Sequence, residues 1–201
     1  MDDGIEEQLR GRLLQESASR EGKRFRGVTS AADPEGSGSG SDPDESAFYE
    51  RVPMATLQPE LNTFVSKSFT QLAAQHYGVQ LDWCEEPKLL RYRPGGQFAA
   101  HADGAELDRE TKVWRKSKDR DLSFLAYLDD GFTGGSLTFT YFNYSIVPRP
   151  GLLVVFPSDI RYTHAAEQVH SGVRHAIVSW ASVWGVPKLY PEPPERAIPC
   201  H

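Results

Sequence analysis

Two segments of the chain repeat apolar residues with the period of a helix. The first predicts a short amphipathic helix near the N-terminus, on Ile5, Leu9 and Leu13. The second covers residues 57–77 and gives the clearest helix, because Pro59 suits a first turn and Gly78 suits the position just past the end. We expect the apolar face of this second helix to pack against a sheet. That face carries Leu61, Phe64, Val65, Phe69 and Leu72.

After Trp83 the pattern changes to short runs of β-forming residues separated by glycine, proline and aspartate. Six of these runs are predicted strands, at residues 88–92, 97–102, 122–128, 136–141, 151–156 and 174–180. Many short strands without helices between them favour an antiparallel sandwich or barrel. With the long helix in front, we expect a mainly β (α+β) fold: a double-stranded β-helix, or jelly roll, packed on at least one helix.

A low-complexity tract separates the first predicted helix from the rest of the chain. Residues 33–46 read DPEGSGSGSDPDES and offer too little apolar surface to offset the entropy of ordering them. We therefore expect residues 1–46 to be a short helix with a flexible linker. The folded domain should cover residues 47–201, with its core motifs at 88–181. Removal of residues 1–45 is expected to leave this domain folded.

Composition and charge narrow the class of protein. A net charge of −6 over 201 residues does not suit a nucleic-acid-binding protein, which normally has a strongly basic face. No stretch approaches the roughly 20 apolar residues that cross a bilayer, and the acidic N-terminus is unlike a secretory signal. Of the two cysteines, Cys84 and Cys200, the second adjoins the C-terminus, where a disulfide would constrain little. We expect a reducing compartment and a cytoplasmic protein, with neither nucleic-acid nor membrane partners.

Candidate metal ligands begin with His101 and Asp103, two residues apart on a predicted strand. Residues i and i+2 of a strand point to the same face, so this imidazole and this carboxylate project side by side. His164 follows a predicted buried strand and a turn at residues 157–159, and it offers a third ligand. Two histidines and one carboxylate leave other metal positions open, as in non-haem Fe(II) oxygenases. A structural zinc site would instead use four protein ligands, usually with more cysteine.

Arg174 lies ten residues after His164, at the start of a predicted strand. Its planar guanidinium can hold a carboxylate through two hydrogen bonds, although an arginine considered alone would more often form a surface salt bridge. His170 is the rival of His164 as third ligand. The ten-residue offset to Arg174 and the preceding FPSD turn favour His164.

Four motifs follow one another between residues 88 and 181. They are YRPGGQFAAHAD at 92–103, LSFLAYLDDGFTGGSLTF at 122–139, VPRPGLLVVF at 147–156, and the closing set of His164, Val169, Gly172 and Arg174. In this order they resemble the motifs of the prolyl 4-hydroxylase-like branch of the Fe(II)/2-oxoglutarate-dependent dioxygenase superfamily. The resemblance covers most of the predicted folded domain and none of the chain before Ala47.

The resemblance implies three Fe(II) ligands, His101, Asp103 and His164. It implies that Arg174 anchors the distal carboxylate of 2-oxoglutarate, that Tyr127 contributes a hydroxyl to that carboxylate, and that Tyr92 lines the cosubstrate pocket. Both tyrosines are also plausible as core aromatics. The implied cofactors are Fe(II), 2-oxoglutarate and O2, with ascorbate as a reductant. The implied reaction hydroxylates an unactivated C–H bond and releases succinate and CO2.

The sequence leaves the substrate open among a peptidyl proline, an amino acid and a small metabolite. In the family, the polar segment at residues 104–121, GAELDRETKVWRKSKDRD, borders the mouth of the active site. It is either a solvated loop or a mobile lid, in which Trp114 and Arg115 are candidate substrate contacts. Two other classes stay open: a non-catalytic jelly-roll binding module, and a cupin-like metal enzyme that does not use 2-oxoglutarate. The expected partner is a protein, peptide or small-molecule substrate, and the oligomeric state is open.

Overall fold

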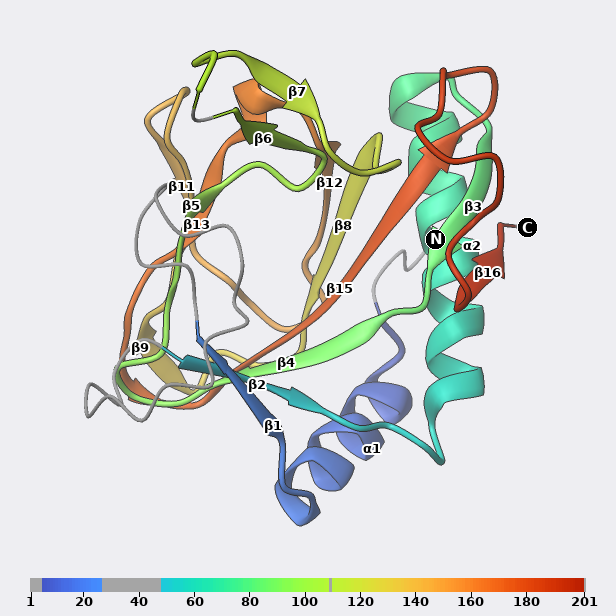
Figure 1. Cartoon of the computed structure of the whole chain (residues 1–201). Coiled ribbons are helices and arrows are strands. Elements are labelled where there is room, and N and C mark those ends of the chain that lie inside the picture. Colours follow the sequence, from blue (N-terminus) through green and yellow to red (C-terminus); the bar gives the residue numbers. More distant parts are fainter. Residues whose placement is uncertain (1–4, 27–47, 109, 201) are drawn as a thin grey trace.

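A large antiparallel sheet forms the centre of the fold (Figure 1). The computed structural model describes residues 5–26, 48–108 and 110–200 of the chain. The strands of this sheet are β1 (Lys23–Arg26), β2 (Phe48–Val52), β3 (Leu81–Glu85), β4 (Lys88–Tyr92), β8 (Leu122–Tyr127), β12 (Leu153–Pro157), β15 (Arg174–Val183) and β16 (Ala197–Pro199). Six of them follow the order β1-β2-β4-β15-β3-β16, while β8 pairs with both β15 and β12.

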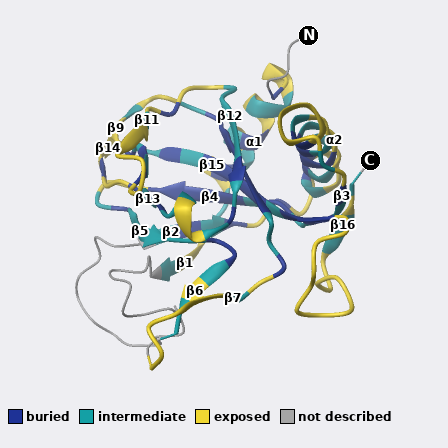
Figure 2. Cartoon of the chain, turned by 90° about the horizontal axis from the view of Figure 1, so that it is seen from above, coloured by how far each residue is buried: buried dark blue, intermediate teal, exposed yellow. Residues whose placement is uncertain are grey.

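Smaller groups of strands lie on one side of the large sheet (Figure 2). The order β11-β10-β13-β5 makes a four-stranded sheet from β5 (Phe98–His101), β10 (Leu137–Phe139), β11 (Tyr144–Ile146) and β13 (His164–Ala166). Two further pairs are β9 (Phe132–Gly134) with β14 (Val169–Gly172), and β6 (Ala105–Leu107) with β7 (Trp114–Lys116). A short 3-10 helix, η2 (Ile160–Tyr162), precedes β13. The helices α1 (Glu7–Ser19) and α2 (Gln58–Tyr77) pack on the other side of the large sheet.

The central strands are buried on both faces, and this explains why their sequences are almost continuously apolar. Every residue of β8 is buried. Phe124 and Ala126 belong to the hydrophobic cluster that includes the helices, whereas Leu125 and Tyr127 belong to the cluster on the side of the smaller sheet. Side chains alternate along a strand, so one β8 sequence serves both clusters. The same alternation on β15 directs its even-numbered residues, from Arg174 onward, toward the smaller sheet.

The helix predicted at residues 57–77 is α2, and it ends where expected. Gly78 follows it in the left-handed conformation, with φ of 64°, and its N–H bonds back to the last turn. The six predicted strands are present as β4, β5, β8, β10, β12 and β15. Within the described part of the chain, no helix has both the length and the apolar character that crossing a membrane requires.

The first predicted helix is also present, as α1, but it is built into the core. Leu13 is fully buried in the same cluster as the apolar face of α2. The buried Arg91 of β4 donates through Nη1 to the carbonyl of Ser17 at 2.5 Å, and Arg10 donates to the carbonyl of Leu128 at 3.0 Å. Charged side chains that satisfy buried carbonyls in this way tie the helix to the large sheet.

This arrangement differs from the expected start of the folded domain near Ala47. The chain before that point contributes α1 to the core and β1 to the large sheet, where β1 pairs with β2. The short helix carries few apolar residues, and its burial depends on contacts with strands far along the chain, which its own sequence does not display. The linker expected at residues 33–46 lies outside the described residues.

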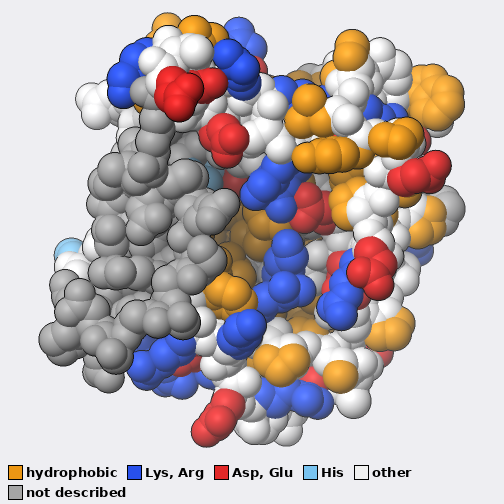
Figure 3. All heavy atoms as spheres, viewed as in Figure 1, with side chains coloured by type: hydrophobic (Ala, Val, Ile, Leu, Met, Phe, Trp, Pro, Cys, Tyr) orange, Lys and Arg blue, Asp and Glu red, His pale blue; other side chains and the backbone are white. Residues whose placement is uncertain are grey.

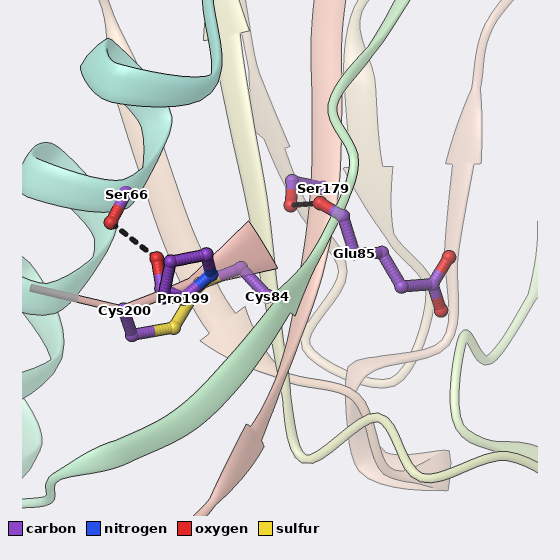
Figure 4. Close-up of a disulfide and its surroundings, with 6 residues drawn as sticks. All are labelled: Ser66, Cys84, Glu85, Ser179, Pro199 and Cys200. Carbon is purple, nitrogen blue, oxygen red and sulfur yellow. Dashed lines mark hydrogen bonds between the residues drawn. A yellow bond between two sulfur atoms is a disulfide. The ribbon is translucent and has the colours of Figure 1, made fainter. Parts of the chain in front are cut away.

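A disulfide joins Cys84 of β3 to Cys200, just after β16 (Figure 4). Strand β16 pairs with β3 and brings Ile198 opposite Cys84, so the end of the chain returns to the large sheet. The hydroxyl of Ser66 in α2 donates to the carbonyl of Pro199 at 2.8 Å, and this hydrogen bond links the end of the chain to α2. The pairing differs from the interpretation that a disulfide at Cys200 would constrain little, because the last strand joins the large sheet. The cytoplasmic location stays a prediction, now without support from free cysteines.

The buried position of α1 leads to a test of its role in stability. Leu13→Ala should lower the free energy of unfolding by about 2–5 kcal/mol, because it leaves a cavity against the core. Gln8→Ala, an exposed change on the same helix, should alter the free energy by less than about 0.5 kcal/mol. Urea unfolding of both variants measures this. Equal midpoints for Leu13→Ala and the unmodified protein would mean that α1 is not part of the cooperative unit.

Candidate metal centre

Antiparallel pairing of β13 with β5 brings together two histidines from distant parts of the chain. His164, the first residue of β13, lies opposite His101, the last residue of β5. The Asp103 carboxylate lies 3.4 Å from His101 Nε2 and 3.6 Å from His164 Nε2. One ligand atom from each of the three residues lies within 4.8 Å of the others. The three side chains predicted to bind metal are thus close enough to share one ion.

A backbone carbonyl orients each imidazole. Nδ1 of His101 lies 2.9 Å from the carbonyl oxygen of Ala99, and Nδ1 of His164 lies 2.9 Å from that of Tyr162. Because a carbonyl oxygen only accepts, Nδ1 carries the proton in both rings and donates it. Nε2 of each neutral ring keeps its lone pair for a metal. Burial lowers the pKa of His164, which favours this neutral form.

The Asp103 carboxylate is buried and held in its charged form. Burial alone would raise its pKa, but the positive charge that His164 and His101 carry whenever they are protonated, together with the hydrogen bond from Ser123, outweighs that effect, and the pKa of Asp103 falls well below its usual range. Ser123 adds a hydrogen bond from its hydroxyl to Asp103 Oδ2 at 2.6 Å, and Ser158 lies 2.7 Å from the same hydroxyl. The carboxylate is therefore ionised and fixed in orientation.

Arg174 carries a buried charge whose donors are only partly used. Its side chain is 1% exposed, and its Nη2 donates to the Tyr127 hydroxyl at 3.3 Å. Nε and Nη1 are buried and find no hydrogen-bond partner in the described part of the chain. Leaving such donors unpaired is costly, so the geometry suits a carboxylate that accepts from them. This is the fit that 2-oxoglutarate requires at its distal end.

The two predicted tyrosines flank Arg174. The guanidinium carbon lies 4.7 Å from the centre of the Tyr92 ring and 5.2 Å from that of the Tyr127 ring, distances typical of cation–π contacts. Burial raises the pKa of both phenols, so both stay neutral. Tyr92 lines the cavity, while Tyr127 contacts Arg174 but is not among the lining residues. Each tyrosine is also part of the apolar cluster between the sheets, so each is both a core aromatic and a neighbour of Arg174.

A cavity of about 330 Å³ connects the three candidate ligands with Arg174. Its wall uses the inward-facing residues of the large sheet, which alternate along β4 and β15, and the facing strands β5 and β13. A volume of this size is typical of small-molecule sites. The cavity can therefore hold a metal ion and a small dianion side by side.

The remaining predicted positions fall outside the cavity. Trp114 and Arg115 lie on β7, in a hairpin with β6, and do not line it; Arg115 pairs instead with Asp108 at 3.5 Å. Their role in substrate contact stays a prediction. His170 is exposed on β14 and takes no part in the metal-binding group found among the described residues.

Several residues of the site were not identified from the sequence. Ser123 is one, although it shares the inner face of β8 with Leu125 and Tyr127 and could have been found from that alternation. Gly104 is another: a Cβ there would lie 2.4 Å from the carbonyl oxygen of Arg120, so only glycine lets the chain turn beside Asp103. Residues of β1 and β2 also line the cavity, and nothing in those short strands signals it.

The sequence matches known proteins over the segment that carries this site. Residues 87–182 match the family described as the 2OG-Fe(II) oxygenase superfamily. Over 89 residues the chain is 40% identical to prolyl 3-hydroxylase 3 and 34% identical to prolyl 3-hydroxylase 2, both of Homo sapiens. These alignments cover 40% of this chain but only 12% and 13% of the relatives, so the chain spans a small part of their length.

Two solved structures share the fold. The viral collagen prolyl hydroxylase of Paramecium Bursaria Chlorella virus-1, in its 2OG complex, superposes with a TM-score of 0.58 and 16% identity, over 91% of this chain and 94% of that one. A Pseudomonas putida prolyl-4-hydroxylase gives a TM-score of 0.55 and 17% identity, over 90% and 89%. This likeness confirms the predicted double-stranded β-helix.

The choice between His164 and His170 can be tested by metal binding without turnover. His164→Ala should lower Co(II) affinity at least about a hundredfold, since loss of a direct ligand exceeds the 10- to 100-fold effect of an outer residue. His170→Ala should leave the affinity unchanged. Anaerobic calorimetric titration of both folded variants measures this. The reverse result would show that His164 has been wrongly assigned.

Proposed function

We propose that this chain, whose residues 87–182 match the 2OG-Fe(II) oxygenase superfamily, is a prolyl hydroxylase-like dioxygenase that depends on Fe(II) and 2-oxoglutarate. With iron, 2-oxoglutarate and O2 bound, such a site hydroxylates an unactivated C–H bond and converts 2-oxoglutarate to succinate and CO2. The observation that carries the proposal is the buried guanidinium of Arg174, with two unpartnered donors, in the same cavity as the His-Asp-His group.

In this proposal His101, Asp103 and His164 hold the iron. Three features support the assignment: the lone pairs of both Nε2 atoms are available, the carboxylate is ionised, and carbonyls or hydroxyls fix all three side chains. Three protein ligands leave metal positions open for cosubstrate and oxygen. The residues of the protein orient the metal ion and the molecules that bind to it.

Arg174 binds the distal carboxylate of 2-oxoglutarate, and its place in the fold suits that role. It sits at the buried end of the cavity, where Tyr92 and Tyr127 fix the guanidinium plane. Low exposure strengthens a charge-assisted pair, because water competes little for its hydrogen bonds.

Aromatic side chains around the metal centre exclude water from the reacting end. The ring of Phe98 lies 4.3 Å from that of His101, and the ring of Phe156 lies 4.8 Å from that of His164. A dry, apolar wall suits a reaction at an unactivated C–H bond, because water would compete for the oxidant.

The substrate we propose is a prolyl residue in a peptide or protein, with a free amino acid or a small metabolite as the alternatives. The names of the curated relatives, prolyl 3-hydroxylases, support proline as the residue class. We also propose ascorbate as the reductant that keeps the iron in its Fe(II) state between turnovers.

The activity can be tested on the purified full chain with Fe(II), ascorbate and 2-oxoglutarate under air. We expect succinate release that depends on 2-oxoglutarate, and a mass increase of 16 in a proline-containing peptide that is converted. Metal binding without any 2-oxoglutarate turnover would contradict the proposal and favour a cupin-like metal enzyme. A folded protein that binds no metal would favour a non-catalytic binding module.

Substitution of Arg174 tests the use of 2-oxoglutarate in particular. Arg174→Ala leaves a carboxylate unpaired, which costs about 3–5 kcal/mol, so 2-oxoglutarate affinity should fall more than about a hundredfold. Arg174→Lys keeps the charge without the planar fork and should show a smaller loss. Anaerobic titration of 2-oxoglutarate into the Fe(II)-loaded variants, followed by the metal-to-ligand charge-transfer absorbance, measures both. Unchanged affinity in Arg174→Ala, with iron binding intact, would argue against 2-oxoglutarate.

A further inference from the structure

Four cationic side chains line the more exposed part of the cavity, and we refer to them as the cationic rim: Arg51, Lys88, Lys118 and Arg120. They come from β2, from the first residue of β4 and from the segment between β7 and β8. Figure 3 shows lysine and arginine side chains gathered over the middle of this face, beside a hollow. The whole chain has a net charge of −6, so the rim is a local reversal of charge at the entrance to the site.

Two members of the rim are held in place by one carboxylate and one aromatic ring. Arg120 contacts both Glu85 oxygens, at 2.5 and 2.8 Å, and Lys88 contacts Glu85 at 3.4 Å. Arg120 and Lys88 also lie over the Trp180 ring, 3.7 and 4.7 Å from its centre. Glu85 therefore neutralises one of the two charges, and Trp180 orients both.

The other two members, Arg51 and Lys118, have no carboxylate within 4.0 Å among the described residues. Burial, and after it the charge of Arg120, lowers the pKa of Lys118. Burial also lowers the pKa of Lys88, although Glu85 opposes the shift. The rim thus holds cations that repel one another, and a bound anion would relieve that repulsion.

The rim is continuous with the metal centre. Arg120 Nη1 lies 3.5 Å from the carbonyl oxygen of Asp103. On another wall, the ring of Phe98 lies 4.3 Å from that of His101, and the ring of Tyr49 lies 5.2 Å from that of Phe98. An apolar residue can pack on these rings while a neighbouring charged group reaches the rim.

We propose that the cationic rim binds an acidic side chain of a peptide substrate, close in sequence to the apolar residue that reaches the metal centre. The inference rests on the proposed function and adds the substrate class to it. The carboxylate of 2-oxoglutarate has its own partner in Arg174, which is buried, so the cosubstrate does not need Arg51 or Lys118. A carboxylate side chain at the rim adds the negative charge that Glu85 alone does not supply.

The test uses two capped heptapeptides with a central proline, one with two glutamates on each side and the other with glutamines. Each is titrated by calorimetry, without oxygen, into the full chain loaded with Fe(II) and 2-oxoglutarate. The glutamate peptide should bind about tenfold more tightly, and the difference should shrink as salt is raised from 0.05 to 0.5 M. The double variant Arg51→Gln, Lys118→Gln should reduce the preference to about twofold or less.

Lys67→Gln is the control for a general effect of lost positive charge, because it removes a cation from an exposed position on α2, outside the cavity. It should keep the full preference. Equal binding of the two peptides, binding of neither, or a preference that survives in the double variant would overturn the proposal. So would a double variant that loses 2-oxoglutarate affinity but keeps the preference, since the rim would then serve the cosubstrate.

Succinate release, measured on the same preparation, distinguishes failure of the acidic subsite from failure of the proposed reaction. A protein that prefers the glutamate peptide and loses that preference in the double variant has the acidic subsite, whether or not it turns over 2-oxoglutarate. Absence of succinate release in that protein would refute the proposed reaction alone. The salt dependence of the unmodified protein supplies a second measurement if the double variant fails to fold.

Discussion

The register between β5 and β13 is the constraint on which the metal centre depends. His164 and His101 are 63 positions apart in the chain, by subtraction of their numbers, and they meet only because their strands pair with these two residues opposite each other. A shift by one residue would turn the imidazole of His164 to the other face of the sheet. The same strand pairs on its other edge with β10, where Phe139 lies opposite His164. The position of His164 is thus fixed from both sides.

Two charged side chains are buried between the sheets, Asp103 at the metal centre and Arg174 on β15. The large sheet determines how the second of them is placed. Alternation along β15 and β8 directs Arg174 into the cavity and Tyr127 to the same side of the sheet, while Ala126 and Ile177 pack in the cluster that includes the helices. A guanidinium buried with unfilled donors destabilises a fold by itself. Aromatic faces and one hydroxyl reduce that penalty without cancelling the charge, which leaves binding energy for an anionic ligand.

The sequence was sufficient for the parts that depend on local pattern or on a spaced motif. The 3.6-residue period identified α2, apolar runs identified β4, β8 and β15, and the motif around His101 and Asp103 identified two of the three side chains that the fold brings together as possible metal ligands. It was insufficient where pairing partners are distant and short. Strands β1 and β16 are three or four residues long, and their place at the edges of the large sheet depends on partners that only the folded chain brings together. The cationic rim could not be predicted for the same reason, because its four residues come from separate elements.

The bond between Cys84 and Cys200 spans 116 positions and makes that part of the chain a closed covalent ring. His101, Asp103, His164 and Arg174 all lie inside it. A single break in the backbone of the ring, for example at the exposed Tyr141, leaves the two pieces linked rather than free to separate. In a chain-entropy description, a closure of this length restricts the unfolded state enough to favour folding by about 4–5 kcal/mol. In the oxidised protein, a single proteolytic cut therefore leaves the residues of the metal site on one linked molecule. A reductant that breaks the disulfide removes that link.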